Sequence, residues 1–295
     1  MRQEPPAPLL YREGLGVAAL ETHDRSGPVA IWFHGGGWVD GRADNLLRPA
    51  RHLQRRGVAS MLVEYRVHAR DGTMVADAVA DAIAATRFLL ARAGRRRVFL
   101  GGASAGGLLA IHAAAAAGRA VDGLFLISPV LDLSAGGFRS AAVPAGGDES
   151  LSPLHMALPR LPPTLLLHGL RDRLVPAADS GRFAQRLRAA GGVADLELFP
   201  PCGHGFHHAE PWRSLVAALL HFFIRRTADA AYRRRPRPAP AAAPILAGEE
   251  DGAKPAPVRQ PAHAGETAAA ARSPPRSSPP APPPHAPATP GAAAR

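Results

Sequence analysis

Ser104 lies in Gly102-Ala103-Ser104-Ala105-Gly106, between a short apolar run and an Ala/Leu-rich segment. A Gly-x-Ser-x-Gly pattern between a strand and a helix is typical of a nucleophile elbow, a strained turn that presents the serine hydroxyl at the carboxyl end of the strand. The helix N-terminus behind the serine would favour developing negative charge. In a glycine-rich chain five residues are weak evidence alone, and Ser104 as a simple helix N-cap is the alternative.

A serine hydroxyl becomes a strong nucleophile when a base takes its proton and a third group orients that base. His204 is the expected base, because the glycines on both sides of it allow a tight turn toward the serine. Asp172, which follows the preceding apolar run, is the expected carboxylate. The order Ser104, Asp172, His204 is the one found when the three side chains follow successive strands of one sheet. The sequence therefore predicts a Ser-His-Asp catalytic triad.

Other polar residues near these positions have simpler interpretations. His207 and His208 are the alternatives to His204 as the base. Asp179 is a weaker rival of Asp172 because it falls inside an expected helix, and Asp132 is expected to hold a loop by hydrogen bonding. A zinc site at the three neighbouring histidines is a minor alternative, since only Cys202 could add a ligand nearby, and we expect neither a metal nor an organic cofactor.

A tetrahedral intermediate also needs hydrogen-bond donors for its oxyanion. His34-Gly35-Gly36-Gly37-Trp38 directly follows the apolar run 29–33, and glycines let main-chain N–H groups approach a ligand. The N–H of Ala105, just after the serine, is a second source. We expect Gly36, Gly37 and Ala105 to form the oxyanion hole, with His34 orienting the glycine loop.

Short apolar runs alternate with longer helical patterns over most of the chain. This alternation predicts an α/β fold with a mostly parallel central sheet and helices on both faces, whose active site lies at the carboxyl ends of the strands. The long connection 133–160 is rich in Gly, Ser and Pro and is the expected pocket wall or small lid. Expected strands cover 15–20, 29–33, 58–63, 98–100, 124–127, 164–167 and 196–199; expected helices cover 44–56, 73–93 (capped by Gly72-Thr73), 177–190, 211–226 and the segment after Ser104.

The composition changes at about Thr227. Residues 1–226 have the size and apolar content of one catalytic domain, whereas 227–295 are Ala/Pro/Arg-rich and are expected to be disordered. The net charge of +11 does not predict a specific nucleic-acid partner, because arginines are spread over several helices without interleaved aromatics. The single cysteine and the lack of an apolar leader or membrane-span pattern predict a cytoplasmic protein without disulfides.

Four motifs in order carry a family resemblance: His34-Gly35-Gly36-Gly37-Trp38, Gly102-Ala103-Ser104-Ala105-Gly106-Gly107, His168-Gly169-x-x-Asp172-x-x-Val175-Pro176 and Gly203-His204-Gly205-Phe206. Over about residues 28–224 the chain resembles α/β-hydrolases of the hormone-sensitive-lipase-like esterases and of the neighbouring feruloyl-esterase and kynurenine-formamidase-like branch. The resemblance implies Ser104, Asp172 and His204 as the triad and Gly36, Gly37 and Ala105 as the oxyanion hole. Ala103, where those esterases usually carry Asp, and the absence of their long N-terminal cap favour a small or absent cap.

These observations predict a serine hydrolase that cleaves small-molecule carboxylic esters of small to medium acyl chain through an acyl-enzyme. An aryl-formamidase would use the same residues on an amide substrate. The alternatives outside catalysis are a ligand-binding protein on a hydrolase scaffold, which is expected to lose a triad member, and an interaction protein whose function lies in the tail.

Overall fold

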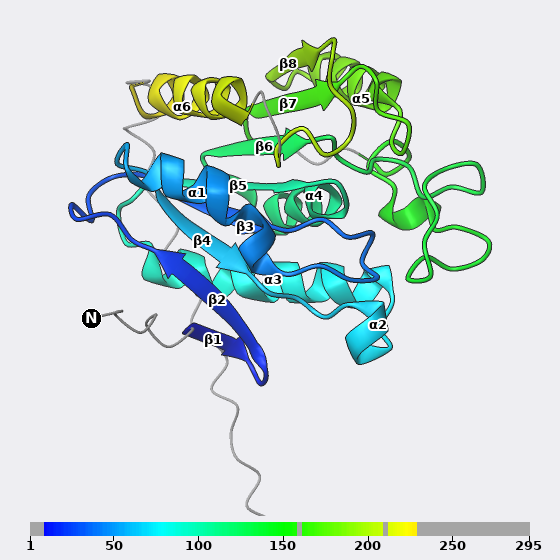
Figure 1. The fold of residues 1–295 in the computed structure, drawn as a ribbon, viewed down its shortest axis with the longest axis horizontal. Helices are drawn as coiled ribbons and strands as arrows, with labels where there is room; N and C mark the ends of the chain where they lie inside the picture. The colour runs from blue at the N-terminus through cyan, green and yellow to red at the C-terminus, as the bar shows by residue number, and fades with distance from the viewer. Residues whose placement is uncertain (1–8, 158–160, 209–211, 229–295) are drawn as a thin grey trace, which may run out of the picture. The chain divides into compact units, whose positions relative to one another are not determined.

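The computed structural model describes residues 9–157, 161–208 and 212–228, all within one compact unit, Met1–Ala243. In this part of the chain eight strands form a single sheet in the order β1-β2-β4-β3-β5-β6-β7-β8 (Figure 1). The first two residues of the expected tail, 227 and 228, are helical, so the tail boundary at 227 was too early. Residues 229–295 lie outside the described part of the chain, so their disorder stays a prediction. The strands are β1 (Leu9–Arg12), β2 (Leu15–Leu20), β3 (Val29–Phe33), β4 (Ala59–Val63), β5 (Val98–Ala103), β6 (Gly123–Ile127), β7 (Thr164–Gly169) and β8 (Ala194–Phe199).

The six strands β3 to β8 of the described sheet run parallel to one another. Its two antiparallel pairs are β1 with β2 and β2 with β4. Every residue of β3, β4, β5, β6 and β7 is buried, as expected for strands covered on both faces. The carboxyl ends of β3, β5, β7 and β8 consequently lie along one edge of the sheet, as the sequence predicted.

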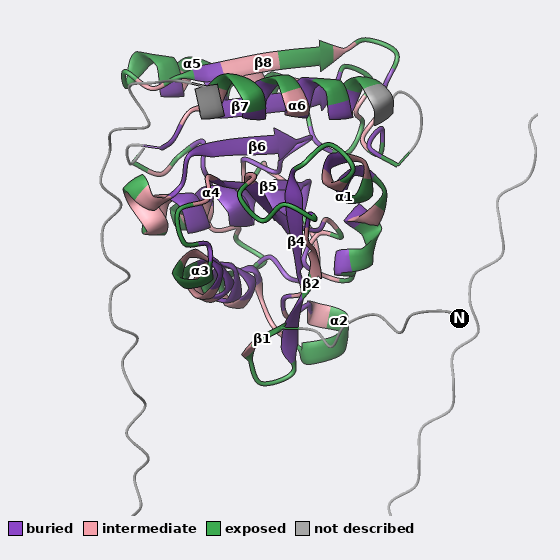
Figure 2. Ribbon diagram, turned by 90° about the vertical axis from the view of Figure 1, so that its left-hand side faces the viewer, coloured by how far each residue is buried: buried purple, intermediate pink, exposed green. Residues whose placement is uncertain are grey.

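Helices cover both faces of this sheet. The apolar side chains of α3, α4 and α5 pack in one buried cluster with one face, and those of α1 and α6 pack in a second cluster with the other. Figure 2 shows the buried sheet between helices whose outer sides are exposed. The helices are α1 (Leu47–Gln54), α2 (His68–Asp71), α3 (Val75–Arg92), α4 (Ala105–Ala117), α5 (Ala177–Ala189) and α6 (Trp212–Ala228), with 3₁₀ turns at Ala43–Leu46, Gly118–Ala120 and Glu149–Leu151.

Three local differences from the sequence predictions have physical causes. The short strand β1 was not predicted, because its stability comes from pairing with β2 and not from its own pattern. Helix α3 begins at Val75, two residues later than expected, and the carboxylate of Asp77 accepts the N–H of Met74 at its start. Strand β7 continues to Gly169, so His168 belongs to the strand and does not follow it.

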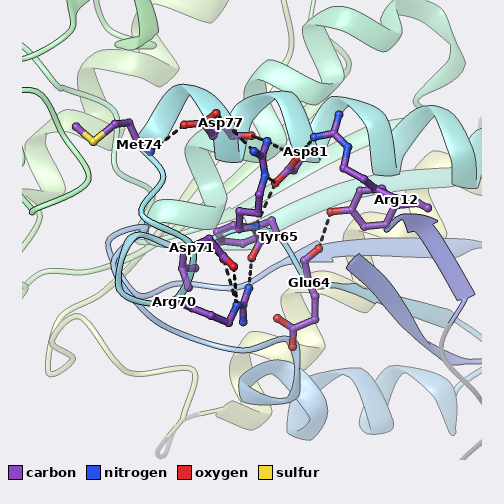
Figure 3. Close-up of polar contacts among 11 residues, drawn as sticks. Arg12, Glu64, Tyr65, Arg70, Asp71, Met74, Asp77 and Asp81 are labelled. Carbon is purple, nitrogen blue, oxygen red and sulfur yellow. Dashed lines mark hydrogen bonds and ion pairs between the residues drawn. The ribbon is translucent and has the colours of Figure 1, made fainter. Parts of the chain in front are cut away.

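A buried carboxylate ties β1 to the rest of the domain. Asp81 of α3 is fully buried and accepts hydrogen bonds from Arg12 at 2.5 Å and from the Arg66 side chain at 2.8 and 2.9 Å. The hydroxyl of Tyr11 also donates to the carbonyl oxygen of Glu64, at 2.6 Å. Figure 3 shows Arg12 and Asp81 side by side in this network. These contacts fix the edge of the sheet that the sequence left undefined.

The connection between β6 and β7 is the expected long irregular segment. Its described part contains one 3₁₀ turn, and Asp132 holds its start by accepting the N–H of Ser134 and a hydrogen bond from His155. Phe138 from this connection packs edge-on against Trp38, which lies in the loop after β3. The connection therefore forms a wall beside the carboxyl end of β3.

Among the described residues no helix combines the length and the apolar character that a membrane span requires.

Candidate active site

Ser104 occupies the turn between β5 and α4 and has a backbone conformation that non-glycine residues rarely adopt. Its φ is 55° and its ψ is −120°, a strain that costs about 1–3 kcal/mol and persists only where the surrounding structure enforces it. A Cβ atom on Gly106 would overlap the carbonyl oxygen of Phe33, and one on Gly102 would overlap the backbone of Gly106. The two glycines therefore let α4 pack closely on the strands and hold the turn in this conformation.

The structure brings Ser104, His204 and Asp172 together in one hydrogen-bonded line. Ser104 Oγ lies 2.9 Å from His204 Nε2, and His204 Nδ1 lies 2.7 Å from Asp172 Oδ2. A carboxylate can only accept, so Nδ1 carries the ring proton and Nε2 is free to accept the proton of the serine hydroxyl. The arrangement has the geometry of a nucleophile, its base and an orienting acid.

Asp172 is held as an anion. Its side chain is fully buried, and burial raises its pKa, but hydrogen bonds from the N–H of Val175, from His204 and from the N–H of Leu174 outweigh that effect and leave the pKa below its usual value. Both backbone N–H groups lie 2.9 Å from Oδ1. Oδ2 remains directed at His204. The loop after β7 thus holds one oxygen of the carboxylate and favours its charged form.

The glycine loop after β3 lies against the same serine. A Cβ atom on Gly35 would come within 3.3 Å of Ser104 Cβ, which places the loop in direct contact with the elbow. Gly36 and Gly37 have φ values of 120° and 61°, a region that favours glycine. Their N–H groups and that of Ala105 donate to no acceptor within the described part of the chain. Three unpaired donors near one serine oxygen form a site for negative charge.

His34, at the start of this loop, holds it through its side chain. Its Nδ1–H donates to the carbonyl oxygen of Gly35 at 2.7 Å, its ring stacks on Tyr65 with centroids 4.0 Å apart, and the Tyr65 hydroxyl donates to the carbonyl oxygen of His34. Burial lowers the pKa of His34 to about 4, so the ring is neutral at pH 7. The 3.7 Å approach of its Nε2 to Glu64 is therefore not an ion pair at that pH.

A cavity of about 380 Å³ opens in front of Ser104 and His204. The glycine loop forms one side of it, and the apolar side chains of Val39, Phe138 and Leu174 contribute to its wall. Ser140 also lines the cavity, and its hydroxyl donates to the carbonyl oxygen of Gly37 at 2.7 Å. The expected pocket wall and the expected oxyanion loop are thus joined by a hydrogen bond that the sequence did not indicate.

The alternative residues lie elsewhere or have other partners. His207 is buried, with its pKa lowered to about 3 by burial, and does not contact Ser104 or Asp172 through a hydrogen bond. Asp179 pairs with Arg182 inside α5. Within the described ranges no three His, Cys, Asp or Glu side chains come together in a way that could hold a metal ion. Among the described histidines, only His204 joins the serine to the carboxylate.

Sequence reasoning missed one residue of this site. His168, fully buried in β7, contacts the same oxygen of Asp172 as His204 does, at 3.1 Å. The available signal was its spacing. A histidine at the end of a buried strand, four residues before the acid, lies close enough to contact a carboxylate in the loop that follows the strand.

Comparison with known proteins identifies the fold of this chain. A sequence profile of the alpha/beta hydrolase fold matches residues 30–146. Esterase LipC of Mycobacterium tuberculosis is 29% identical over 225 residues, which are 61% of this chain and 53% of LipC, so the chain spans about half the length of that relative.

Solved structures of one esterase share the arrangement of elements. Esterase 2 of Thermogutta terrifontis with bound propionate superposes with a TM-score of 0.65 at 24% identity, over 76% of this chain and 96% of that one. The same esterase phosphoramylated by tabun gives a TM-score of 0.65 at 25% identity, over 76% and 97% of the two chains. The topology, the profile and the superpositions together show that the described part of this chain is an α/β-hydrolase-fold domain, which confirms the fold that the motifs predicted.

Proposed function

We propose that this domain is a serine hydrolase that cleaves carboxylic esters of small to medium acyl chain through an acyl-enzyme. The observation that carries the proposal is the continuous hydrogen-bonded line from Asp172 through His204 to Ser104 beside three unpaired main-chain donors. These groups match the nucleophile, the proton-transferring base, the orienting acid and the oxyanion donors of acyl transfer, and Ser104 is presented by a strained turn.

The reaction begins when His204 Nε2 takes the hydroxyl proton as Ser104 Oγ attacks the ester carbonyl carbon. The carbonyl oxygen becomes an oxyanion, which accepts hydrogen bonds from the N–H groups of Gly36, Gly37 and Ala105. Collapse of this intermediate breaks the C–O bond, and the imidazolium of His204 gives its proton to the departing alcohol. Asp172 stabilises the imidazolium throughout. Water then attacks the acyl-serine by the same route, and the carboxylic acid leaves.

The volume of the cavity favours an acyl group of limited size. Its volume of about 380 Å³ lies near the lower end of the 300–1,000 Å³ typical of small-molecule sites, and Val39, Phe138 and Leu174 give it an apolar side. Propionate and butyrate are bound in two of the solved structures of the Thermogutta esterase. We therefore expect acetate to butyrate esters to be better substrates than octanoate esters.

An aryl-formamidase is the second candidate, because the same line of residues serves amide cleavage. The groups that contact the leaving group decide between them, and Asn45, His207 and His208 are polar residues that line the cavity. These polar groups suit a leaving group that can form hydrogen bonds.

The test is hydrolysis of p-nitrophenyl acetate, butyrate and octanoate beside N-formylkynurenine, with Ser104→Ala as the control. We expect turnover of the short esters that falls at least 10³-fold in Ser104→Ala. Faster turnover of N-formylkynurenine than of any ester would select the formamidase. A wild type inactive on all four substrates, or an active Ser104→Ala, overturns the proposal.

A further inference from the structure

A second histidine contacts the carboxylate of Asp172. His168 lies at the end of β7 with its side chain fully buried. Its Nε2 is 3.1 Å from Asp172 Oδ2 and 3.1 Å from the carbonyl oxygen of Val175, and its Nδ1 is 2.8 Å from the hydroxyl of Ser180 in α5. No step of the mechanism above uses this residue.

The surroundings of His168 fix the position of its proton. Both groups near Nε2 are acceptors, a carboxylate and a carbonyl, so Nε2 must carry the hydrogen. Nδ1 must then accept, and the Ser180 hydroxyl is the donor that faces it. Burial lowers the pKa of His168, which keeps the ring neutral with one proton. His168 therefore donates to Asp172 in a single tautomer, which the two acceptors at Nε2 select and the Ser180 hydroxyl completes by donating to Nδ1.

With this bond each of the two oxygens of the Asp172 carboxylate accepts two hydrogen bonds. Oδ1 accepts the N–H groups of Leu174 and Val175, and Oδ2 accepts from His204 and from His168. A buried carboxylate with fewer donors would have freedom to rotate, and more of its charge would fall on the oxygen that faces His204. The donor from His168 removes both effects.

We propose that His168 and Ser180 are positioning residues for the reaction. They extend the line Asp172–His204–Ser104 by two members and act only through Asp172. The inference rests on the proposed function for its kinetic consequence, whereas its tautomer can be measured in a protein without any substrate.

The other charged groups near this line do not replace the donor. Arg171 and Arg173 flank Asp172 in the chain, and Asp179 of α5 pairs with Arg182. His207 and His208 follow His204, and burial lowers the pKa of both. None of these side chains forms a hydrogen bond to Asp172 within the described ranges.

The first experiment needs no activity. In full-length protein labelled with ¹⁵N-histidine, His168, assigned through the loss of its signals in His168→Gln, should show a protonated Nε2 and an unprotonated Nδ1 at pH 7. A protonated Nδ1, with or without Nε2, overturns the inference even if the protein proves to be a good esterase.

The second experiment measures kcat, KM and the pH profile of p-nitrophenyl butyrate hydrolysis. His168→Phe fills the space without a donor, and His168→Gln keeps an amide N–H that can reach Asp172. We expect kcat to fall about tenfold in His168→Phe with KM within twofold, and the acid limb of kcat/KM to move up by roughly half a pH unit. His168→Gln should recover most of both. Equal losses in the two variants, or no loss in either, overturn the inference.

Ser180→Ala tests the outer member with a matched control. Ser60 is also fully buried, and its hydroxyl accepts from Trp32 Nε1 at 3.2 Å, away from the triad. Ser180→Ala should lower kcat about threefold, whereas Ser60→Ala should leave kcat unchanged at a similar loss of thermal stability. If the two variants affect kcat alike, the role of Ser180 is structural only. Should the wild type hydrolyse no ester, the proposed function fails, and the tautomer measurement still decides the arrangement of His168.

Discussion

Ser140 and Gly37 join two segments that are 103 positions apart in the chain. The hydroxyl of Ser140 donates to the carbonyl oxygen of Gly37 at 2.7 Å, which ties the connection between β6 and β7 to the expected oxyanion loop. This carbonyl belongs to the peptide between Gly37 and Trp38, so holding it restricts the rotation of the adjacent peptide between Gly36 and Gly37, which carries the Gly37 N–H. The wall of the cavity thus helps to hold the loop in which we expect the oxyanion donors.

We predict that Ser140→Ala lowers kcat for p-nitrophenyl butyrate about three- to tenfold. The reason is that the loop at Gly37 loses a restraint, and the Gly37 N–H can turn away from the expected position of the oxyanion. Ser150→Ala is the matched control, since Ser150 is exposed and bonds only within its own turn, to Asp148. Equal kcat values for Ser140→Ala and the wild type would show that the loop is held by His34 and Tyr65 alone.

Gly106 is predicted to be intolerant of any side chain. A Cβ atom there would overlap the Phe33 carbonyl oxygen, which is backbone and cannot move aside, so Gly106→Ala should destabilise the domain by several kcal/mol or abolish soluble expression. At Gly181 in α5 the methyl group of an alanine would meet nothing within 4 Å, and Gly181→Ala should raise the free energy of unfolding by about 0.5–1 kcal/mol. Urea unfolding of both variants checks the pair. A stable Gly106→Ala would contradict the close approach of α4 to β3.

Much of this arrangement could be predicted from the chain because glycines mark it. The elbow and the glycine loop need their glycines, His204 lies between two glycines in the sequence, and buried parallel strands have continuous apolar runs. The hydrogen bond from Ser140 could not be predicted, since it depends on the packing of distant segments. The contact of His168 had only the spacing to Asp172 as a signal, and its assignment also needed the exact end of β7. Strand β1 was missed for a similar reason, because its partners lie in β2, α3 and the segment after β4.

Loss of Arg66 is predicted to lower the stability of the domain more than loss of Arg12. Arg66 donates twice from its side chain to the buried carboxylate of Asp81, whereas Arg12 donates once and is 44% exposed. Arg66→Met should lower the free energy of unfolding by about 3–5 kcal/mol because Asp81 is left largely uncompensated. Arg12→Met should cost about 1 kcal/mol. Chemical denaturation measures both, and equal costs would contradict the role given to Arg66.

The stability of the domain should fall on mild acidification. The pKa of His34 is lowered to about 4 in the folded state by burial, whereas an unfolded histidine titrates near 6.5, so between these values the unfolded chain binds the extra proton. The free energy of unfolding should therefore fall as the pH drops through this window, by about 2 kcal/mol between pH 7 and pH 5 from His34 alone. His207, with its pKa lowered to about 3, acts in the same direction.

Urea unfolding of the wild type and of His34→Asn at pH 7 and pH 5 isolates this contribution. The variant should be less stable at pH 7 but should lose roughly 2 kcal/mol less than the wild type between the two pH values. An identical pH dependence in the two proteins would mean that His34 has the same pKa in the folded and unfolded states, which contradicts the effect of its burial.

The proposed function requires that Ser104 is a nucleophile activated by His204. The most direct measurement is the intact mass and peptide map of the protein after reaction with a fluorophosphonate, together with the rate of that reaction. We predict one phosphonyl group, on Ser104, with loss of fluoride, no adduct in Ser104→Ala, and a rate at least 100-fold lower in His204→Ala. No adduct on the folded wild type, an adduct on another residue, or an unchanged rate in His204→Ala would contradict the account.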